Sequence, residues 1–243
     1  MIETPPPGVP VPPVGPWQQS TVVGIRSETP KTKPFRLRLD EPMAYLPGQH
    51  VVVRLTAPDG YTASRSYSLA SAPNGSQEIE LTVERLDDGE VSGFLHDELA
   101  VQDRLEVRGP IGQWFVWQGD VPALLIGGGS GVVPLMSMLR FSRSRGQSDL
   151  LQLVASVRSP ADLYYATELP GPETTVLYTR VAPDGWPRHA GRIAAGDLDE
   201  VMLRARRVYV CGSTGFADAV TSLLEDGGVS ADRIRVERFG ASG

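Results

Sequence analysis

The chain reads Leu124-Leu125-Ile126-Gly127-Gly128-Gly129-Ser130-Gly131-Val132-Val133-Pro134 near its centre, and this segment predicts a strand, a turn and a helix. Glycines let a backbone approach a pyrophosphate closely, and the first turn of a helix supplies positive potential to it. The segment departs from the G-x-G-x-x-G pattern because it ends in Pro134 at the helix start. It indicates a turn that binds the phosphates of a dinucleotide.

Strand-like and helical segments alternate from residue 121 to the end of the chain. Strands are expected at Pro122–Ile126, Leu150–Val157, Thr174–Tyr178, Val208–Cys211 and Arg233–Glu237. Helices are expected at Val132–Ser144, Ala161–Leu169, Leu198–Ala205 and Gly215–Asp226. This alternation predicts βαβ units and therefore a parallel sheet.

The residues before 121 follow a different pattern, in which short β segments are separated by turn residues. Strands are expected at Thr21–Arg26, Phe35–Leu39, His50–Thr56, Arg65–Leu69, Glu78–Glu84 and Arg104–Val107. Such spacing predicts a small antiparallel barrel, interrupted by a helix over 92–99 with Ser92 as its N-cap. We expect domains at 17–118 and 119–243 after a poorly ordered, proline-rich tail at 1–16.

Composition excludes several classes of protein. Residues 1–120 carry 10 basic and 16 acidic side chains and residues 121–243 carry 13 of each, so no basic face for nucleic acid is expected. Cys211 is the single cysteine, which rules out a disulfide or a four-cysteine iron–sulfur cluster within this chain. No secretory signal, membrane segment or metal site is predicted, and a cytoplasmic monomer is expected.

The segment Arg65-Ser66-Tyr67-Ser68-Leu69-Ala70-Ser71 places an arginine and an aromatic ring on one face of a strand. A guanidinium suits a pyrophosphate, an aromatic ring suits stacking on a flat cofactor, and a serine suits a hydrogen bond to a ring nitrogen. An ordinary polar edge strand is the alternative.

Two more segments carry candidate ligand contacts. The first begins a helix, with the sequence Gly89-Glu90-Val91-Ser92-Gly93-Phe94-Leu95-His96, and the N–H groups of its first turn would face a phosphate. The alternative is an ordinary capped helix with no ligand, which has the same sequence pattern. Val210-Cys211-Gly212-Ser213-Thr214-Gly215-Phe216 ends a strand, where ligands of open α/β sheets bind. Cys211 is otherwise a small buried apolar residue. His96 and His189 are expected at the surface.

The order of these segments is more specific than any one of them. P-G-Q-H at 47–50 precedes R-S-Y-S-L-A-S, G-E-V-S-G-F-L-H, G-P-I-G at 109–112, the glycine turn, V-C-G-S-T-G-F and finally E-R-F-G at 237–240. That order resembles the ferredoxin–NADP reductase superfamily over residues 18–240. The resemblance implies an N-terminal antiparallel Greek-key β-barrel for FAD, followed by a five-stranded parallel α/β domain for nicotinamide.

The resemblance also implies roles for individual residues. Arg65 would bind the flavin pyrophosphate, Tyr67 would stack on the isoalloxazine, and Ser68 would hydrogen-bond near its N5 atom. Val91 and Ser92 would meet the pyrophosphate through their amides. The remaining cofactor contacts expected in the barrel are His50, Ser66, Thr82 and Glu90, with a purely structural role for His50 as the alternative.

In the second domain, residues Gly128, Gly129, Ser130, Gly131 and Val132 would hold the NAD(P) pyrophosphate. Cys211 and Gly212 would line the nicotinamide site. Glu237 and Phe239 would lie by the other face of the flavin. The residues expected to be catalytic are Ser68, Cys211 and Glu237.

The choice between NADPH and NADH depends on the residues after the expected second and third strands. Ser156 and Arg158 end the second strand, with no acid before Asp162, and Arg180 and Arg192 follow the third. Guanidinium groups can clasp a 2′-phosphate, which favours NADPH over NADH. These arginines are solvated surface charges in the alternative interpretation.

The predicted activity is transfer of hydride from NAD(P)H to FAD and of single electrons onward to a separate ferredoxin, flavodoxin or oxygenase component. Flavin suits this role because nicotinamide gives two electrons and an iron–sulfur protein accepts one. Many oxygenase reductases of the family carry a fused cluster domain, which one cysteine cannot supply. Reduction of free flavins or ferric chelates is the first alternative. The second alternative is a non-catalytic nucleotide-binding subunit or a sensor. The intact motifs argue against it.

Overall fold

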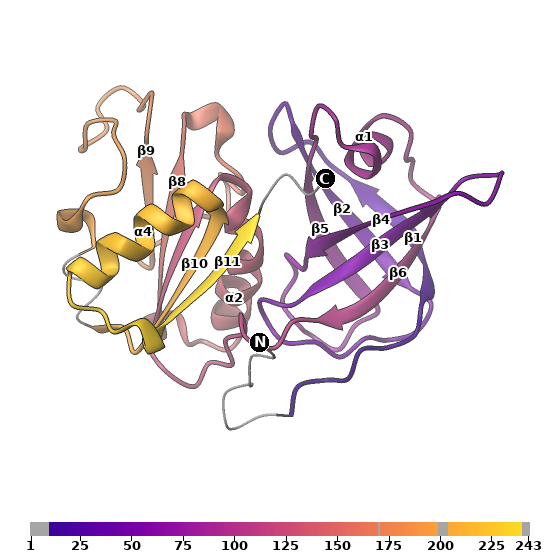
Figure 1. Cartoon of the computed structure of the whole chain (residues 1–243), viewed down its shortest axis with the longest axis horizontal. Helices are drawn as coiled ribbons and strands as arrows, with labels where there is room; N and C mark the ends of the chain where they lie inside the picture. Colours follow the sequence, from indigo (N-terminus) through magenta and orange to yellow (C-terminus); the bar gives the residue numbers. More distant parts are fainter. Residues whose placement is uncertain (1–9, 170, 199–203, 240–243) are drawn as a thin grey trace. The chain divides into compact units, whose positions relative to one another are not determined.

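The computed structural model describes residues 10–169, 171–198 and 204–239 of the chain. It divides into two compact units, with the boundary between Val116 and Trp117 (Figure 1). The first unit contains antiparallel strands and one helix, and the second alternates strands with helices. Each unit is described separately below.

The first unit is a six-stranded antiparallel sheet. Its elements are β1 (Gln18–Ile25), β2 (Thr32–Leu39), β3 (His50–Thr56), β4 (Thr62–Ser68), β5 (Glu78–Glu84), α1 (Glu90–Asp97) and β6 (Arg104–Ile111). The strand order is β4-β3-β6-β1-β2-β5, so β6 pairs between β3 and β1 as a Greek-key connection does. The antiparallel prediction is confirmed.

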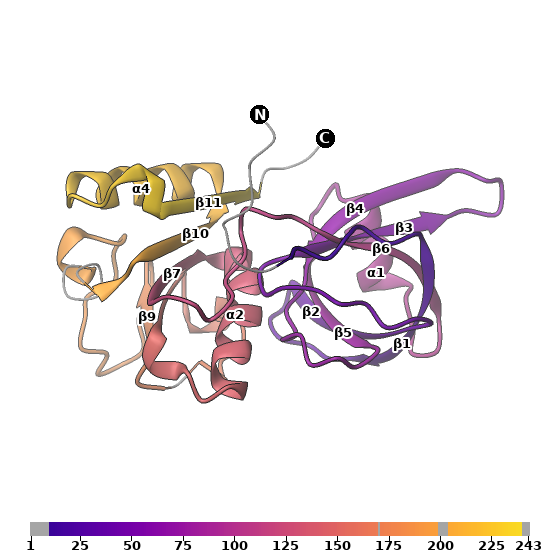
Figure 2. The same ribbon diagram turned by 90° about the horizontal axis from the view of Figure 1, so that it is seen from below.

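The two edge strands of this sheet approach each other at one point. Leu69 and Leu81 form an antiparallel bridge, and the Ala70 N–H donates to the Glu80 carbonyl at 2.8 Å. Alternate residues of the strands, among them Phe35, Leu37 and Val53, fill the barrel interior. Helix α1 lies across one end of the barrel, where Val91 and Leu95 complete this core (Figures 1 and 2).

Two predictions about α1 are wrong. The helix begins at Glu90 with Gly89 as its N-cap, so Ser92 lies in the first turn. The Ser92 hydroxyl instead accepts from the Leu86 N–H and donates to the Gly89 carbonyl, each at 3.2 Å. His96 is buried and not exposed, because its ring faces the barrel and its Nε2 lies 2.9 Å from the Val83 carbonyl.

The second unit has a five-stranded parallel sheet with the order β11-β10-β7-β8-β9, which confirms the α/β prediction. Its strands are β7 (Ala123–Gly128), β8 (Leu151–Val157), β9 (Thr174–Tyr178), β10 (Arg207–Ser213) and β11 (Ile234–Phe239). Helices α2 (Val132–Ser144) and α4 (Thr214–Asp226) cover opposite faces of the sheet (Figure 2). The short 3-10 helices are η1 (Gly129–Gly131), η2 (Ser148–Leu150), η3 (Pro160–Asp162), η4 (Ala195–Asp197) and η5 (Ala231–Arg233).

The helix expected at Ala161–Leu169 is not an α-helix. Only the single turn η3 forms, and Tyr165 takes a left-handed backbone with φ of 57°, which no regular helix tolerates. Tyr164 and Tyr165 are buried there, and Arg140 on α2 clasps Glu168 with two hydrogen bonds of 2.8 and 2.6 Å. Packing therefore overrides local propensity. Most of the helix expected at Leu198–Ala205 lies outside the described residues.

No helix in the described parts of the chain is long and apolar enough to cross a membrane. Within the same residues, no group of three or more His, Cys, Asp or Glu side chains is placed to hold a metal ion. Residues 10–16 take no regular secondary structure, although the Gly15 N–H donates to the Gly109 carbonyl at 2.9 Å.

Candidate cofactor sites

The R-x-Y-S segment forms β4, and its register with β3 defines the first candidate site. Tyr67 pairs with Val51 and Arg65 with Val53, whose side chains are buried in the barrel. Paired residues of an antiparallel sheet share a face, so Arg65 and Tyr67 lie on the inner side of β4. Ser66 is exposed on the opposite face, and Ser68 is buried at the strand end.

The electrostatics of this strand keep Tyr67 neutral. Burial raises the pKa of its hydroxyl to about 12, and the nearby positive charge of Arg65 opposes that shift without cancelling it. The Tyr67 ring packs against the barrel core. The Arg65 guanidinium donates to the Ser64 carbonyl at 2.8 Å and forms no ion pair among the described residues. It therefore remains available to an anion.

His50 lies opposite Ser68 in the register of β3 and β4. Burial lowers the pKa of the His50 ring, so the ring is neutral at pH 7. Beside it, the buried Gln49 side chain accepts from the Leu46 N–H and donates to the Gly112 carbonyl, each at 2.7 Å. Gln49 thus joins two loops around the end of β3.

Ser68 and Thr82 come together through the closure of the barrel. They are the next residues in the antiparallel register of the Leu69–Leu81 bridge, and both are buried. Among the residues at the start of α1, Val91 and Ser92 are buried and Glu90 is exposed. A Cβ atom on Gly89 would lie 2.3 Å from the Ser92 Oγ atom and 2.9 Å from the Leu86 Cβ atom, so a larger residue at the N-cap would have to displace the Ser92 hydroxyl.

The glycine turn of the second unit packs directly on the end of β10. A Cβ atom on Gly131 would lie 2.1 Å from the Cys211 carbonyl oxygen, and one on Gly128 would lie 2.7 Å from the Phe216 ring. A Cβ on Gly212 would meet the same ring at 2.7 Å. Real Cβ contacts are longer, so a side chain on Gly131 would have to displace backbone and one on Gly128 or Gly212 would have to displace the Phe216 ring. These contacts pack the turn onto β10, whereas a Cβ atom on Gly129 would meet nothing within 4 Å, so the backbone at Gly129 is open to a phosphate.

The carboxyl ends of the strands bring further predicted residues into register. Ser156 of β8 pairs with Gly128 of β7. Cys211 of β10 lies between Gly127 on one side and Glu237 on the other. Phe239 ends β11 opposite Ser213. These positions share the edge of the sheet at which ligands of α/β folds bind.

Cys211 and Glu237 have shifted acidities. Burial, and then the charge of Glu237, raises the pKa of the Cys211 thiol, which therefore stays protonated near pH 7. Burial raises the pKa of Glu237 to about 7. The Glu237 residue as a whole is partly exposed, but its Oε2 atom is buried without a hydrogen-bond partner among the described residues. Glu237 is the group here that can exchange a proton near neutral pH.

The three arginines predicted beside the nucleotide ribose lie in the segments that follow β8 and β9. The Arg180 N–H donates to the Arg158 carbonyl at 3.0 Å, and the Gly191 N–H donates to the Tyr178 carbonyl at 2.9 Å. Arg192 follows Gly191 directly, so this second bond holds its backbone near the carboxyl end of β9. All three side chains are exposed, and among the described residues none forms a hydrogen bond or ion pair. A group of unpaired guanidiniums is suited to an anion.

Sequence reasoning assigned no role to three residues that the structure makes important. Gln49 was visible in the P-G-Q-H segment, but its two loop contacts depend on the fold. Phe216 fills the space above Gly128 and Gly212. Tyr61 is separated from Arg65 and Tyr67 by even numbers of residues, so strand alternation places all three on one face. The sequence alone could have shown this.

Comparison with known proteins identifies both units. Residues 19–116 match the family described as oxidoreductase FAD-binding domain. Residues 125–222 match the family described as oxidoreductase NAD-binding domain. The bare glycine backbone and the strand bearing Arg65 and Tyr67 fall within these two matches.

Two curated relatives and one solved structure illustrate the likeness. The chain is 33% identical over 236 residues to the glycine betaine monooxygenase reductase subunit of Chromohalobacter salexigens, covering 90% of this chain but only 63% of that protein. It is 28% identical over 230 residues to the reductase component of the naphthalene 1,2-dioxygenase system of Pseudomonas putida, covering 91% and 68%. The FAD/NAD-binding domain of nitric oxide dioxygenase from Vibrio cholerae superposes with a TM-score of 0.77 at 26% identity, covering 92% and 98%.

Proposed function

Because this chain belongs to the two-domain oxidoreductases that join an FAD-binding domain to an NAD-binding domain, we propose that it is an FAD-dependent NAD(P)H reductase. Its acceptor is a separate one-electron carrier, namely a ferredoxin, a flavodoxin or an oxygenase component. Relatives named as reductases of oxygenase systems support this proposal. We assign FAD to residues 17–118 and the nicotinamide to residues 119–243.

The observation that carries the proposal is the packing of the glycine turn on the end of β10. Gly131 fits against the backbone of β10 only because it lacks a Cβ atom, a Cβ atom on Gly129 would meet nothing within 4 Å, and α2 begins directly after this turn at Val132. Such backbone fits a pyrophosphate that must come close to the chain. The residues present therefore fit a dinucleotide.

In the first unit, Arg65 would bind the flavin pyrophosphate together with the amides of Val91 and Ser92. The neutral Tyr67 ring would stack on the isoalloxazine. The hydroxyl of Ser68 would donate a hydrogen bond near the flavin N5 atom. Bound FAD supplies the redox chemistry, since it exchanges two electrons with nicotinamide and single electrons with a carrier.

In the second unit, residues 128–132 would hold the pyrophosphate of the nicotinamide dinucleotide, and Cys211 and Gly212 would line the site of its ring. A protonated thiol is a poor nucleophile, so Cys211 contributes shape and not covalent chemistry. Glu237 would hold or release a proton at its buried Oε2 atom, because its pKa lies near 7. The exposed Arg158, with Arg180 and Arg192, favours NADPH over NADH.

Steady-state assays with NADPH and with NADH test this function. The FAD-reconstituted protein is expected to reduce ferricyanide, and to reduce cytochrome c only when a ferredoxin is added. Rapid reduction of free FMN, with no effect of ferredoxin, would replace the proposal with a free-flavin reductase. Absence of any ferricyanide reduction would indicate a non-catalytic nucleotide-binding subunit.

A further inference from the structure

The connection from β9 to η4 is a long loop, because residues 179–194 contain no regular helix or strand. Pro183, Gly185, Pro187 and Gly191 lie within it. A loop of this length loses much conformational entropy when it takes one path, so specific contacts must hold it there. Arg192, assigned above to the 2′-phosphate of NADPH, lies in this loop. The contacts that fix the loop therefore bear on that assignment.

One guanidinium, that of Arg188, lies at the centre of these contacts. Its Nε and Nη2 atoms donate to the two carboxylate oxygens of Asp197 at 2.6 and 2.7 Å. Its Nη1 atom donates to the carbonyls of His189 and Gly191 at 3.1 and 3.3 Å. Nη2 also donates to the Arg192 carbonyl at 2.8 Å. A guanidinium has five N–H donors, and Arg188 therefore uses all of them within its own loop.

Asp197 closes the loop from its far end. Its Oδ2 atom also accepts from the Ala194 N–H at 2.8 Å. Burial raises the pKa of the Asp197 carboxyl, but the hydrogen bonds from Arg188 and Ala194 lower it by more, so the carboxylate is charged at pH 7. The side chains of Arg188 and Asp197 are only 26% and 14% exposed. A shielded two-fold pair of this kind is stronger than an ordinary surface ion pair.

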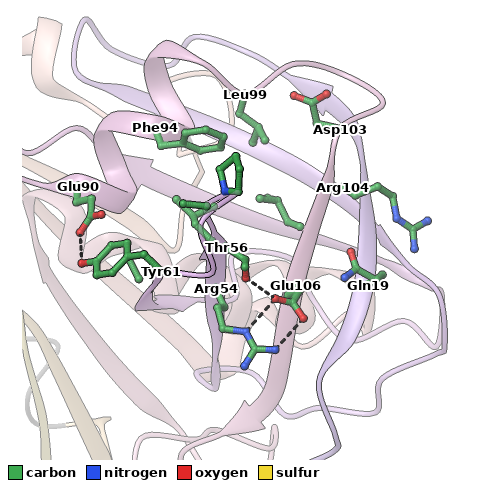
Figure 3. Close-up of a pocket in the computed structure, with 15 residues that line it drawn as sticks. Gln19, Arg54, Thr56, Tyr61, Glu90, Phe94, Leu99, Asp103, Arg104 and Glu106 are labelled. Carbon is green, nitrogen blue, oxygen red and sulfur yellow. Dashed lines mark hydrogen bonds and ion pairs between the residues drawn. The ribbon is translucent and has the colours of Figure 1, made fainter.

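A comparable pair in the first unit shows what is particular about Arg188. Arg54 makes a two-fold pair with Glu106 beside the pocket that Tyr61 and α1 border (Figure 3). Arg54 and Glu106 are also register partners on β3 and β6, so the strand ladder already fixes both backbones. Residues 188–194 belong to no strand or helix. Their path depends on the ion pair itself.

Tyr178, the last residue of β9, anchors the same loop at two points. The Trp186 ring meets the Tyr178 ring edge to face, with centroids 5.1 Å apart. The Gly191 N–H donates to the Tyr178 carbonyl at 2.9 Å. Arg188 lies between these two points along the chain. The backbone of Arg192 is thus held near the carboxyl end of β9 while its side chain remains exposed.

We propose that Arg188 and Asp197 are positioning residues, which fold this loop around one guanidinium and thereby fix Arg192 for the 2′-phosphate of NADPH. This inference rests on the proposed function, since it takes Arg192 as a phosphate contact. Arg188 itself has no N–H donor left for a phosphate, and Asp197 would repel one. The pair therefore acts on the selection of NADPH over NADH and on no chemical step.

Titration of the FAD-loaded protein with 2′,5′-ADP and with AMP tests the proposal, because the two ligands differ only in the 2′-phosphate. Asp197→Asn is expected to raise the Kd of 2′,5′-ADP and the KM for NADPH about tenfold, the loss expected when one charge-assisted contact is no longer held in place. The Kd of AMP, the KM for NADH and both kcat values should stay within about twofold.

Arg188→Lys is the second variant, and it serves alone should circular dichroism show that Asp197→Asn is unfolded. Lysine keeps the charge but lacks the planar fork, so the same selective loss is expected. Arg192→Ala then tests the route. If Asp197 acts through Arg192, Asp197→Asn should add no further loss for 2′,5′-ADP in the Arg192→Ala background. Additive losses would overturn the positioning role.

Glu173→Gln is the matched control, because Glu173 is buried and pairs with Arg143 at 2.6 Å directly before β9, at the opposite end of the strand. It should lower the Tm and leave the ratio of the two Kd values unchanged. Equal rises for AMP and 2′,5′-ADP in Asp197→Asn, or an equal change of the ratio in Glu173→Gln, would overturn the inference. Wild-type protein that binds 2′,5′-ADP no more tightly than AMP would overturn it together with the preference for NADPH, whereas the reductase activity is tested separately by ferricyanide.

Discussion

Gly131 and Cys211 approach so closely that a Cβ atom on Gly131 would lie 2.1 Å from the Cys211 carbonyl oxygen. The two residues are far apart in the sequence, yet their contact joins the glycine turn to the end of β10. It places the start of α2 beside the strand edge that also carries Gly212 and Glu237. The packing of the second unit and its proposed nucleotide site therefore depend on the same contact.

We expect Gly131→Ala to destabilise the second unit, because the added methyl group must displace backbone on one side. Overpacking of this kind costs about 1–3 kcal/mol, and the Kd for NADPH should rise as well. Denaturant unfolding and nucleotide titration measure the two effects. Gly215→Ala is the control, since Gly215 lies in α4 and a Cβ atom added to it would meet nothing within 4 Å. Equal stability of the two variants would contradict the prediction.

Glu237 should make stability depend on pH. Its pKa is about 7 when folded against an ordinary value of 4.5, so the folded state binds the proton more tightly. The stabilisation is complete below pH 4.5 and is lost as pH rises through 7, with a limit of about 3 kcal/mol. As the pH is raised from 5 to 8, the Tm of the wild type should therefore decrease relative to the Tm of Glu237→Gln.

Thermal unfolding of both proteins across that pH range measures the difference. Glu225→Gln is the matched control, because it makes the same substitution at an exposed position of α4. Parallel pH profiles for the wild type and Glu237→Gln would mean that Glu237 has an ordinary pKa.

Arg158→Ala should reduce kcat/KM for NADPH and leave that for NADH nearly unchanged. A lost contact between guanidinium and phosphate costs on the order of 1.5–3 kcal/mol, and NADH has no 2′-phosphate to lose. Arg206→Ala is the control, because Arg206 is exposed just before β10, away from the carboxyl ends of the strands. The assignment is wrong if both nucleotides lose equally, or if the wild type clearly prefers NADH.

Substitutions along β4 should separate flavin binding from flavin reduction. We expect Arg65→Ala and Tyr67→Ala to raise the Kd of FAD, because they remove a charged contact and a stack from the bound cofactor. Ser68→Ala should mainly slow reduction by NADPH in stopped flow, since a bond near N5 matters most in the transition state. Thr62→Ala, at an exposed position of the same strand, is the control. An unchanged reduction rate in Ser68→Ala would remove its proposed role.

The sequence by itself determined the division into an antiparallel and a parallel sheet, the bounds of α2 and the glycine turn. These features follow from local patterns: strand alternation, helical periodicity and the need for backbone without Cβ atoms. The order of the motifs along the chain also indicated the family, because it resembles the order in which the motifs of that family follow one another. None of these inferences required knowledge of which distant residues touch.

The tertiary structure decided the features that depend on distant contacts. Residues 161–169 bury two tyrosines and pair with Arg140 instead of forming a helix, and Gln49 joins two loops that local pattern cannot bring together. The backbones of Arg158 and Arg180 meet only because β8 and β9 lie side by side. Burial sets the pKa of Glu237, and the pocket at Tyr61 exists only where α1 crosses the barrel. A sequence pattern reports local preference, whereas burial and pairing are properties of the whole folded chain.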